Sequence, residues 1–341
     1  MSKPNLSALP TIDLSRLDAD DNSRAAFLNE LREAAHTIGF FYLTGHGIDT
    51  ALTDEIRALA RRFFNLPEQD KLAIEMVHSP HFRGYTRIGM ERTRGLPDWR
   101  EQIDIGAERP VRPRDDNAPW WRLQGPNQWP AALPELREVA LRYQADRHRC
   151  HHRLVHAFAI ALGQPETIFD GVFMPDPQQL LKVIRYPGRD LTDGDQGVGE
   201  HKDGGFVTLL LQDEQEGLQV QYQGEWISAP PIPGTFVVNI GELFELASNG
   251  YLRATVHRVL DASSGQRPAF GAVFFGAKLD GTIPVLSLPA DLASGVRGLT
   301  QDPMNPMFRE VGRNQLKSRL RSHPDVARRH HADLLPQFLP A

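Results

Sequence analysis

The sequence predicts a mainly β core, a sandwich or a jelly-roll barrel, with helical flanks. From Leu180 onward, short runs rich in β-branched and aromatic residues are separated by Gly, Pro and Asp: LLKVIRY, FVTLLLQ, GLQVQY, TFVVNIGELF, ATVHRVL and AFGAVFFGA. In GLQVQYQ, Leu218, Val220 and Tyr222 alternate with glutamines, which is the pattern of a strand with one buried face. Many short strands of this kind favour a sandwich or a jelly-roll barrel.

The front of the chain is expected to be mainly helical. Residues 10–14 indicate a short strand, and Ser23 is a candidate cap for a helix that Gly39 ends. The apolar residues of this helix recur at helical spacing: Phe27, Leu28, Leu31, Ala35 and Ile38. A strand, GFFYLTGHG, follows, and a second amphipathic helix ends before Pro67.

Residues 106–134 are expected to be an ordered loop, and helices are expected on both sides of the β-rich part. The loop holds six prolines, which exclude regular elements, and three tryptophans, which favour packing on the body of the protein. A long helix is expected from about Glu135 to Leu162, with Gly163 as its terminator. Residues 305–335 have a helical pattern that Pro324 starts or breaks.

Composition narrows the class of function. The chain has 341 residues with 40% hydrophobic content, enough for a large core, and its net charge of −5 gives no basic surface for nucleic acid. Cys150 is the only cysteine, which excludes an internal disulfide, and neither a signal peptide nor a long apolar run is present. We therefore expect a cytoplasmic protein with a small-molecule partner and no nucleic-acid or membrane partner. The oligomeric state stays open.

His201, Asp203 and His257 are the candidate metal ligands and catalytic residues. His201 and Asp203 lie in the run GEHKDGGFVTLLLQ, and alternation along an extended strand would point both side chains to one face. His257 follows in ATVHRVL, far enough along the chain to come from another strand. Two imidazoles and one carboxylate on one side of a metal leave other positions open, as in non-haem Fe(II) oxygenases. The sequence thus predicts a catalytic ferrous site.

These residues and the runs around them resemble the iron- and 2-oxoglutarate-dependent dioxygenases related to isopenicillin N synthase. The runs LPTIDLS, IGFFYLTGHGI and RRFFNLPEQDK are similar to the helical N-terminal region of that family. RYPG, EHKDGG, the long run from GLQVQYQ to ELASNG, and VHRV match its core in the same order. The resemblance implies a helical N-terminal region over 1–175, a double-stranded β-helix (jelly-roll) core over 176–290 and a C-terminal helical extension over 291–341.

The resemblance also implies the reaction. Fe(II) would bind 2-oxoglutarate as cosubstrate at two positions and O2 at a third. Oxidative decarboxylation to succinate and CO2 would accompany oxidation, most often hydroxylation, of a small organic molecule. Two alternatives stay open: an oxidase or ethylene-forming type of enzyme with the same fold, and a jelly-roll protein that binds a metal or ligand without turnover.

Arg267 and Tyr186 are the candidate cosubstrate-binding residues. The far carboxylate of 2-oxoglutarate needs a fixed cation, and a guanidinium can bind it with two hydrogen bonds. Arg267 stands where the family has an Arg-x-Ser motif, but Ala269 replaces the serine, which keeps the oxidase alternative open. Tyr186, in the run RYP, matches a family tyrosine that helps to hold the cosubstrate. The pair at 274–275 lies further from Arg267 than the resemblance predicts, so a bulge or a shifted register is expected.

A second group of histidines lies on the predicted long helix. His148, His151, His152 and His156 include two pairs at i,i+4 spacing, whose side chains share a helix face. Asp146 is the only carboxylate that the sequence places near them. The sequence therefore favours solvated helix positions over a second metal site.

Overall fold

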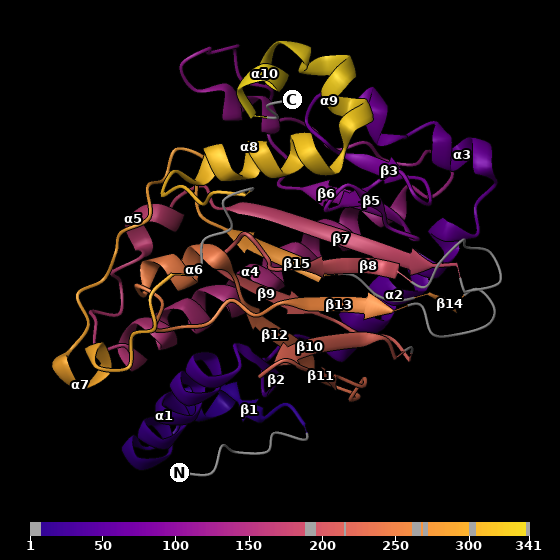
Figure 1. Ribbon diagram of the computed structural model, residues 1–341. Coiled ribbons are helices and arrows are strands. Elements are labelled where there is room, and N and C mark those ends of the chain that lie inside the picture. The colour runs from indigo at the N-terminus through magenta and orange to yellow at the C-terminus, as the bar shows by residue number, and fades with distance from the viewer. Residues whose placement is uncertain are drawn as a thin grey trace.

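The computed structural model describes residues 8–187, 196–214, 216–260, 267–268, 272–299 and 305–338. It contains two large β-sheets with helices packed around them (Figure 1). The mainly β core that the sequence predicts is therefore confirmed.

The larger sheet has nine strands, and its order brings together segments that are far apart in the chain. All of its pairings are antiparallel except that of β1 with β2. In spatial order the strands are β1 (Thr11–Asp13), β2 (Phe40–Thr44), β12 (Phe236–Ile240), β9 (Val207–Leu210), β15 (Ala272–Gly276), β7 (Gln178–Tyr186), β6 (Glu101–Gly106) and β3 (Gly84–Thr86), with β14 (Arg267–Pro268) also paired to β7.

The smaller sheet has four antiparallel strands in the order β11 (Glu225–Ser228), β10 (Leu218–Tyr222), β13 (His257–Leu260) and β8 (Gln196–His201). Leu218, Val220 and Tyr222 are buried, as the alternation predicts. They pack against Phe40 and Tyr42 of β2 in one apolar cluster. The two sheets therefore face each other across a shared interior, as in a jelly roll. A short hairpin of β4 (Arg92–Thr93) and β5 (Leu96–Pro97) stands apart from both sheets.

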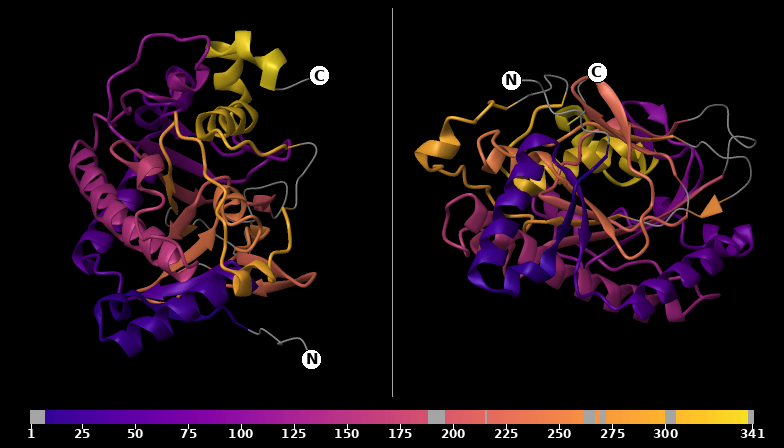
Figure 2. Two further views of the ribbon diagram at one scale, coloured as in Figure 1. Left: turned by 90° about the vertical axis from the view of Figure 1, so that its left-hand side faces the viewer. Right: turned by 90° about the horizontal axis from the view of Figure 1, so that it is seen from below.

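Three long helices cover the outer face of the larger sheet: α1 (Asp21–Thr37), α2 (Thr50–Phe64) and α4 (Glu135–Ala161). Figure 2 shows α2 and α4 side by side along one side of the molecule. Phe158 of α4 packs against Phe41 of β2 and Phe244, and burial of one such side chain stabilises the fold by about 1.5–3 kcal/mol. Ser23 does not cap α1. Asp20 does, because its carboxylate accepts from the first free amides of the helix.

Among the shorter helices of the described residues, only those after residue 305 are expected from the sequence pattern. The shorter helices are η1 (Leu14–Asp18), α3 (Glu68–Leu72), η2 (Met76–His78), η3 (Pro119–Leu123), α5 (Asp170–Phe173), α6 (Glu242–Ala247), α7 (Ala290–Ala293), α8 (Val311–Ser322), α9 (Pro324–His330), η5 (Ala332–Leu334) and α10 (Leu335–Phe338). Pro324 begins α9, and the C-terminal helices lie together at the top of Figure 1. The run TFVVNIGELF is only half strand, since its GELF end begins α6.

The proline-rich loop packs on the body of the protein, as its tryptophans predict. Across residues 107–134, all of which the structure describes, η3 is the one regular element, and Pro119 occupies its first turn. Trp120 lies against Gly312 so closely that a Cβ on Gly312 would be 2.3 Å from the Trp120 ring. Among the described residues, none of the helices combines the length and apolar character that crossing a bilayer requires.

Candidate iron centre

The structure brings His201, Asp203 and His257 together between the two sheets. His257 of β13 is the direct cross-strand neighbour of His201 of β8. Asp203 Oδ1 lies 3.6 Å from His201 Nε2 and 3.7 Å from His257 Nε2. Ligands bound at about 2.1 Å on adjacent octahedral corners stand roughly 3 Å apart, so one ion can reach all three atoms.

The expectation that His201 and Asp203 share one strand is wrong. Strand β8 ends at His201, and Asp203 lies in the loop that leads to β9. The loop is fixed by the backbone, because Asp203 O accepts from the amide of Glu242 at 2.7 Å. A Cβ on Gly241 would be 2.2 Å from Gly205 O, so a glycine is needed where these two backbones meet. Loop geometry, and not strand alternation, therefore aims the carboxylate.

Backbone carbonyls fix the orientation of both imidazoles. His201 Nδ1 lies 2.7 Å from Gly199 O, and His257 Nδ1 lies 3.1 Å from Thr255 O. A carbonyl oxygen can only accept, so each Nδ1 carries the proton and donates it. Each Nε2 then keeps its lone pair on the side that faces Asp203.

Two neutral donors occupy the outer oxygen of Asp203. Thr208 Oγ1 donates to Asp203 Oδ2 at 2.5 Å, and Asn239 Nδ2 donates to the same oxygen at 2.7 Å. They come from β9 and β12 of the larger sheet, and all three side chains are buried. Oδ1 is left facing the histidines. Sequence reasoning missed both donors, although a polar residue inside the buried runs VTLL and FVVNI is a visible signal.

Electrostatics favour the protonation states that a divalent metal needs. Burial, reinforced by neighbouring His257, lowers the pKa of His201 to about 4, so this imidazole is neutral at physiological pH. Burial alone would raise the pKa of Asp203, but the two histidines and the hydrogen bonds from Asn239 and Thr208 bring it below its usual value. A neutral nitrogen and an ionised carboxylate fit Fe(II).

A row of buried charges begins beside the iron ligands. The amide of Gly199, whose carbonyl holds His201, donates to Asp98 Oδ1 at 3.3 Å. Arg100 lies 3.5 Å from Asp98 and 2.7 Å from Glu91. Arg100 is also among the charges that lower the pKa of His201. The row therefore lies beside His201, one of the candidate metal ligands, and contributes to the electrostatics of its imidazole.

The same row continues to the C-terminal helix α8 with alternating sign. Lys182 Nζ lies 2.7 Å from Glu91 and 3.7 Å from Asp104, and Asp104 lies 2.7 Å from Arg319 of α8. Burial would raise the pKa of Glu91, but Arg100 and Lys182 hold it well below its usual value. Each of these charges has a partner of opposite sign. The row therefore forms a polar wall on this face of the larger sheet, where apolar side chains would be usual.

Two polar atoms in this wall lack a partner within the described part of the chain. Arg100 Nε and Gln102 Oε1 are buried and accept or donate no hydrogen bond there, although Gln102 Nε2 donates to Asp104 at 2.8 Å. Gln102 and Asp104 pair with Ile184 and Lys182 of β7, so they share one face of the sheet. Buried polar groups are nearly always hydrogen-bonded, so these two atoms would be satisfied by an ordered water or by a polar group of a ligand.

Tyr186 and Arg267 are brought together at the end of β7. Tyr186 is buried beside Val198 and the partly buried Val259. Val259 lies two residues after His257 on β13. The backbone of Arg267 in β14 is directly opposite Tyr186. Ala269 lies outside the described residues.

The expected change of register is confirmed. Pro268 pairs with Arg185, whereas Val273 pairs with Leu181, so five residues on one strand span four on the other. This extra residue accounts for the greater distance along the chain between Arg267 and the Phe274–Phe275 pair.

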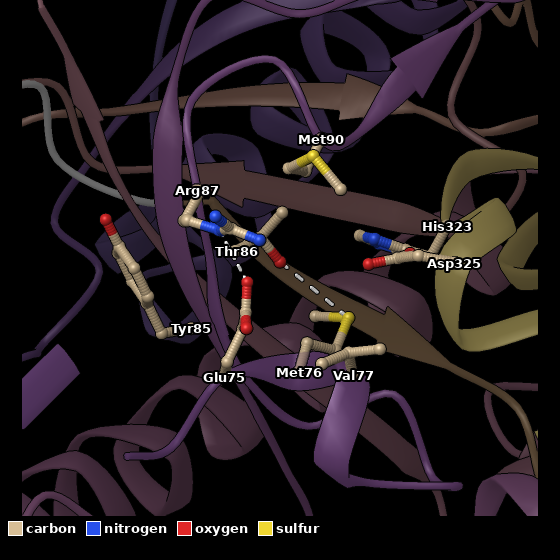
Figure 3. Close-up of a pocket in the computed structure, with 9 residues that line it drawn as sticks. All are labelled: Glu75, Met76, Val77, Tyr85, Thr86, Arg87, Met90, His323 and Asp325. Atoms are coloured by element: carbon tan, nitrogen blue, oxygen red, sulfur yellow. Dashed lines mark hydrogen bonds and ion pairs between the residues drawn. The ribbon is translucent and has the colours of Figure 1, made fainter. Parts of the chain in front are cut away.

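A small surface hollow lies away from the candidate metal ligands, where β3 and η2 meet the α8–α9 junction (Figure 3). Glu75 and Arg87 form an ion pair at 2.6 Å on its wall, and His323 connects it to Glu91 at 3.4 Å. None of the iron ligands lines it. The hollow borders the row of charges and not the candidate metal ligands.

Comparison with known proteins agrees with this geometry. Residues 9–132 match the family described as "non-haem dioxygenase in morphine synthesis N-terminal", and residues 177–275 match the 2OG-Fe(II) oxygenase superfamily. The 2-oxoglutarate-dependent dioxygenase frbJ of Dothideomycetidae sp. (strain 11243) is 37% identical, covering 97% of this chain and 94% of the relative. Homoarginine-6-hydroxylase 2-ODD-C23.1 of Arabidopsis thaliana is 36% identical, covering 85% of this chain and 91% of the relative.

Solved structures of similar fold extend the agreement. A putative 2OG-Fe(II) oxygenase family protein from Caulobacter crescentus has a TM-score of 0.73 at 26% identity, covering 93% of this chain and 99% of that one. A full-length Neurospora crassa protein in complex with alpha-KG has a TM-score of 0.70 at 26% identity, covering 86% of this chain and 94% of that one. Fold and site thus define a non-haem iron oxygenase.

The chain belongs to the 2OG-Fe(II) oxygenase superfamily. It is an oxidoreductase that uses Fe(II), 2-oxoglutarate and O2 to oxidise a small organic molecule. The alternative of a jelly-roll protein that binds without turnover is therefore set aside.

Proposed function

We propose that His201, Asp203 and His257 bind the Fe(II) and that Arg267 and Tyr186 hold 2-oxoglutarate. The observation that carries the proposal is the convergence of two Nε2 atoms and Asp203 Oδ1, each left available by its own hydrogen bonds. Three ligands on one side leave positions for a keto acid and O2. The division into residues 1–175, 176–290 and 291–341 stays part of the proposal, supported by the two family matches at 9–132 and 177–275.

The bound metal and cosubstrate supply the oxidising chemistry, and the chain supplies position and electrostatics. Asp203 offsets part of the metal's charge, while Thr208 and Asn239 prevent its carboxylate from turning. Tyr186 packs over Gly197, where a Cβ would be 2.7 Å from the tyrosine ring, so the ring has a fixed position. A fixed ring next to the backbone of Arg267 suits the binding of one end of 2-oxoglutarate.

The substrate is proposed to be a small molecule that carries charge. The buried wall of Arg100, Gln102, Asp104 and Lys182 would be costly next to an apolar substrate, and two of its polar atoms are free to bind a ligand. Several relatives are named homoarginine-6-hydroxylases, with 33–36% identity. Homoarginine, which has a carboxylate, an amine and a guanidinium, is therefore the first substrate to test. Neither nucleic acid nor a membrane is needed, and the cytoplasmic location stays a prediction.

The test is succinate formation from 2-oxoglutarate under air, with Fe(II) and one candidate substrate at a time. Hydroxylation of homoarginine would increase succinate above the substrate-free rate and give a product heavier by one oxygen atom. Succinate without any stimulation by charged substrates would contradict the proposed substrate class. No succinate with any substrate, together with no visible absorption band on anaerobic addition of Fe(II) and 2-oxoglutarate, would contradict the assigned site.

The products of the same reaction mixture distinguish the oxidase and ethylene-forming alternatives from hydroxylation. An oxidase would consume O2 and substrate without forming succinate. An ethylene-forming enzyme would release ethylene into the headspace from the cosubstrate itself. We expect neither result.

A further inference from the structure

A second group of two histidines and one aspartate lies on the outside of the molecule. His152 and His156 belong to α4, and Asp170 begins α5. Asp170 Oδ1 lies 2.8 Å from His156 Nε2 and 3.6 Å from His152 Nε2, and the two imidazole centroids are 4.0 Å apart. All three ligand atoms are within 4.8 Å of one another, as are those of His201, Asp203 and His257.

The carboxylate partners of these histidines are not the one that the sequence places near them. Asp146 is that residue, but it pairs with Arg149. The chain turns back after α4 at Gly163, whose φ of +69° suits glycine, and this reversal places Asp170 beside the helix face that carries the histidines. Favouring solvated positions was therefore based on an incomplete set of neighbours.

Glu166 orients one of the two imidazoles. Its Oε1 lies 3.2 Å from His156 Nδ1. A carboxylate only accepts, so without a metal each of these contacts needs a proton on the histidine nitrogen. With a metal at Nε2, Nδ1–H would donate to Glu166 and the Nε2 lone pair would face the ion beside Asp170. A histidine that donates Nδ1–H to a carboxylate while Nε2 meets other ligand atoms has the arrangement typical of metal-bound histidine.

The scaffold holds these groups in place. His152 and His156 are one turn apart on a helix of 27 residues. Asp170 follows Phe169, which is fully buried and packs against Phe206 and Phe244. The side chains of His152, His156 and Asp170 are 33%, 15% and 35% exposed, so an ion can enter from solvent without any rearrangement of the core.

We propose that His152, His156 and Asp170 bind a divalent transition-metal ion, with Zn²⁺ the best match to the donors. Zn²⁺ takes imidazole nitrogen and carboxylate oxygen at about 2.0–2.2 Å in a tetrahedron, and three protein ligands leave one position for water. The ion joins α4 to α5 across the 163–169 turn. It is a structural ion that stabilises the folded chain, at a site separate from the one proposed for iron between the sheets.

The competing explanation is a plain ion pair, with His156 doubly protonated between Glu166 and Asp170. It makes a different prediction. An ion pair needs no metal, so the melting temperature would not respond to Zn²⁺ or to a chelator. A metal site would raise the melting temperature by about 3 °C at a hundredfold excess of Zn²⁺ over its dissociation constant, for a chain of this size.

Calorimetric titration with Zn²⁺ tests the proposal in the full-length chain with the iron site removed by His201→Ala and Asp203→Ala. We expect one Zn²⁺ per chain, and loss of at least tenfold in affinity when His152→Ala or Asp170→Asn is added. His78→Ala, which removes an exposed histidine elsewhere, should leave the titration unchanged.

Circular dichroism and melting in the presence of chelator show whether each variant is folded, so a loss of binding is not mistaken for a loss of structure. No Zn²⁺ binding in the folded chain that lacks the iron site would overturn the proposal. So would an unchanged titration after both His152→Ala and Asp170→Asn.

Discussion

The chain holds two clusters of the same composition, two histidines and one aspartate, in different surroundings. His201, Asp203 and His257 lie between two sheets, with Asp203 only 6% exposed. His152, His156 and Asp170 lie between two helices at the surface. In both clusters the three ligand atoms lie within 4.8 Å of one another, so proximity alone does not define a catalytic centre.

The difference lies in what surrounds the ligands. In the buried cluster, backbone carbonyls and neutral side chains hold each ligand, and a row of buried charges continues from it along the sheet. In the surface cluster, the exposed carboxylate of Glu166 orients His156, and the ligand side chains are partly exposed to solvent. An oxygenase needs open metal positions away from bulk water, and the first cluster comes closer to that requirement, because its Asp203 and His257 side chains are 6% and 9% exposed while its His201 side chain is 29% exposed.

The largest expected effect comes from removing a ligand of the buried cluster. Asp203→Ala deletes the one anionic ligand and leaves Thr208 and Asn239 without their acceptor. We expect 2-oxoglutarate turnover to fall by more than about 100-fold, since even residues behind the ligands typically contribute 10–100-fold. Turnover is measured as succinate formed, with the exposed His78→Ala as control. Activity within tenfold of the parent would remove Asp203 from the iron site.

A smaller effect is expected from the residues behind Asp203. Thr208→Val keeps the side-chain shape and removes the hydroxyl that donates to Asp203 Oδ2, so the carboxylate is less restrained. We expect Fe(II) affinity to fall by about tenfold, measured by anaerobic titration at saturating 2-oxoglutarate. Thr235→Val is the matched control, because Thr235 is equally buried but donates to Ile232 O. Equal Fe(II) affinity in the two variants would contradict this role.

Substitutions of the proposed cosubstrate residues should weaken the binding of 2-oxoglutarate and leave metal binding unchanged. Arg267→Gln removes a charge-assisted hydrogen bond, and we expect the KM for 2-oxoglutarate to rise by about 10–100-fold. Tyr186→Phe removes a neutral one and should raise KM by about fivefold. Arg62→Gln, on the exposed side of α2, should change neither. A fall in kcat with unchanged KM would argue against both assignments.

Much of the fold could be predicted because periodicity reports burial directly. The long helix was expected over Glu135–Leu162 and is found over Glu135–Ala161, and the alternation of Leu218, Val220 and Tyr222 correctly gives a buried face. The residue that caps the N-terminus of α1 could not be predicted, because Asp20 and Ser23 are both good acceptors and only the backbone geometry selects between them.

The residues of the candidate site could be predicted from the sequence, but the contacts that hold them in position could not. His201, Asp203 and His257 are identifiable from their motif, whereas the path of the loop that carries Asp203 depends on a contact with Gly241 far along the chain. Thr208 and Asn239 stand out as polar residues in buried strands, but their shared partner is visible only in three dimensions. Asp170 and Glu166 were missed because nothing local specifies where the chain goes after Gly163.

Substituting Glu166 should weaken Zn²⁺ binding at the surface cluster only moderately. Glu166 contacts His156 Nδ1 from a side chain that is 55% exposed, so it should position the imidazole without binding the ion itself. We expect Glu166→Ala to weaken Zn²⁺ binding by about tenfold, the low end for such residues. Glu166→Gln, whose amide oxygen still accepts from Nδ1–H, should stay within about threefold of the parent. If Gln weakened binding as much as Ala, charge and not orientation would be the contribution of Glu166, and the surface cluster would be closer to an ion pair than to a counterpart of the iron centre.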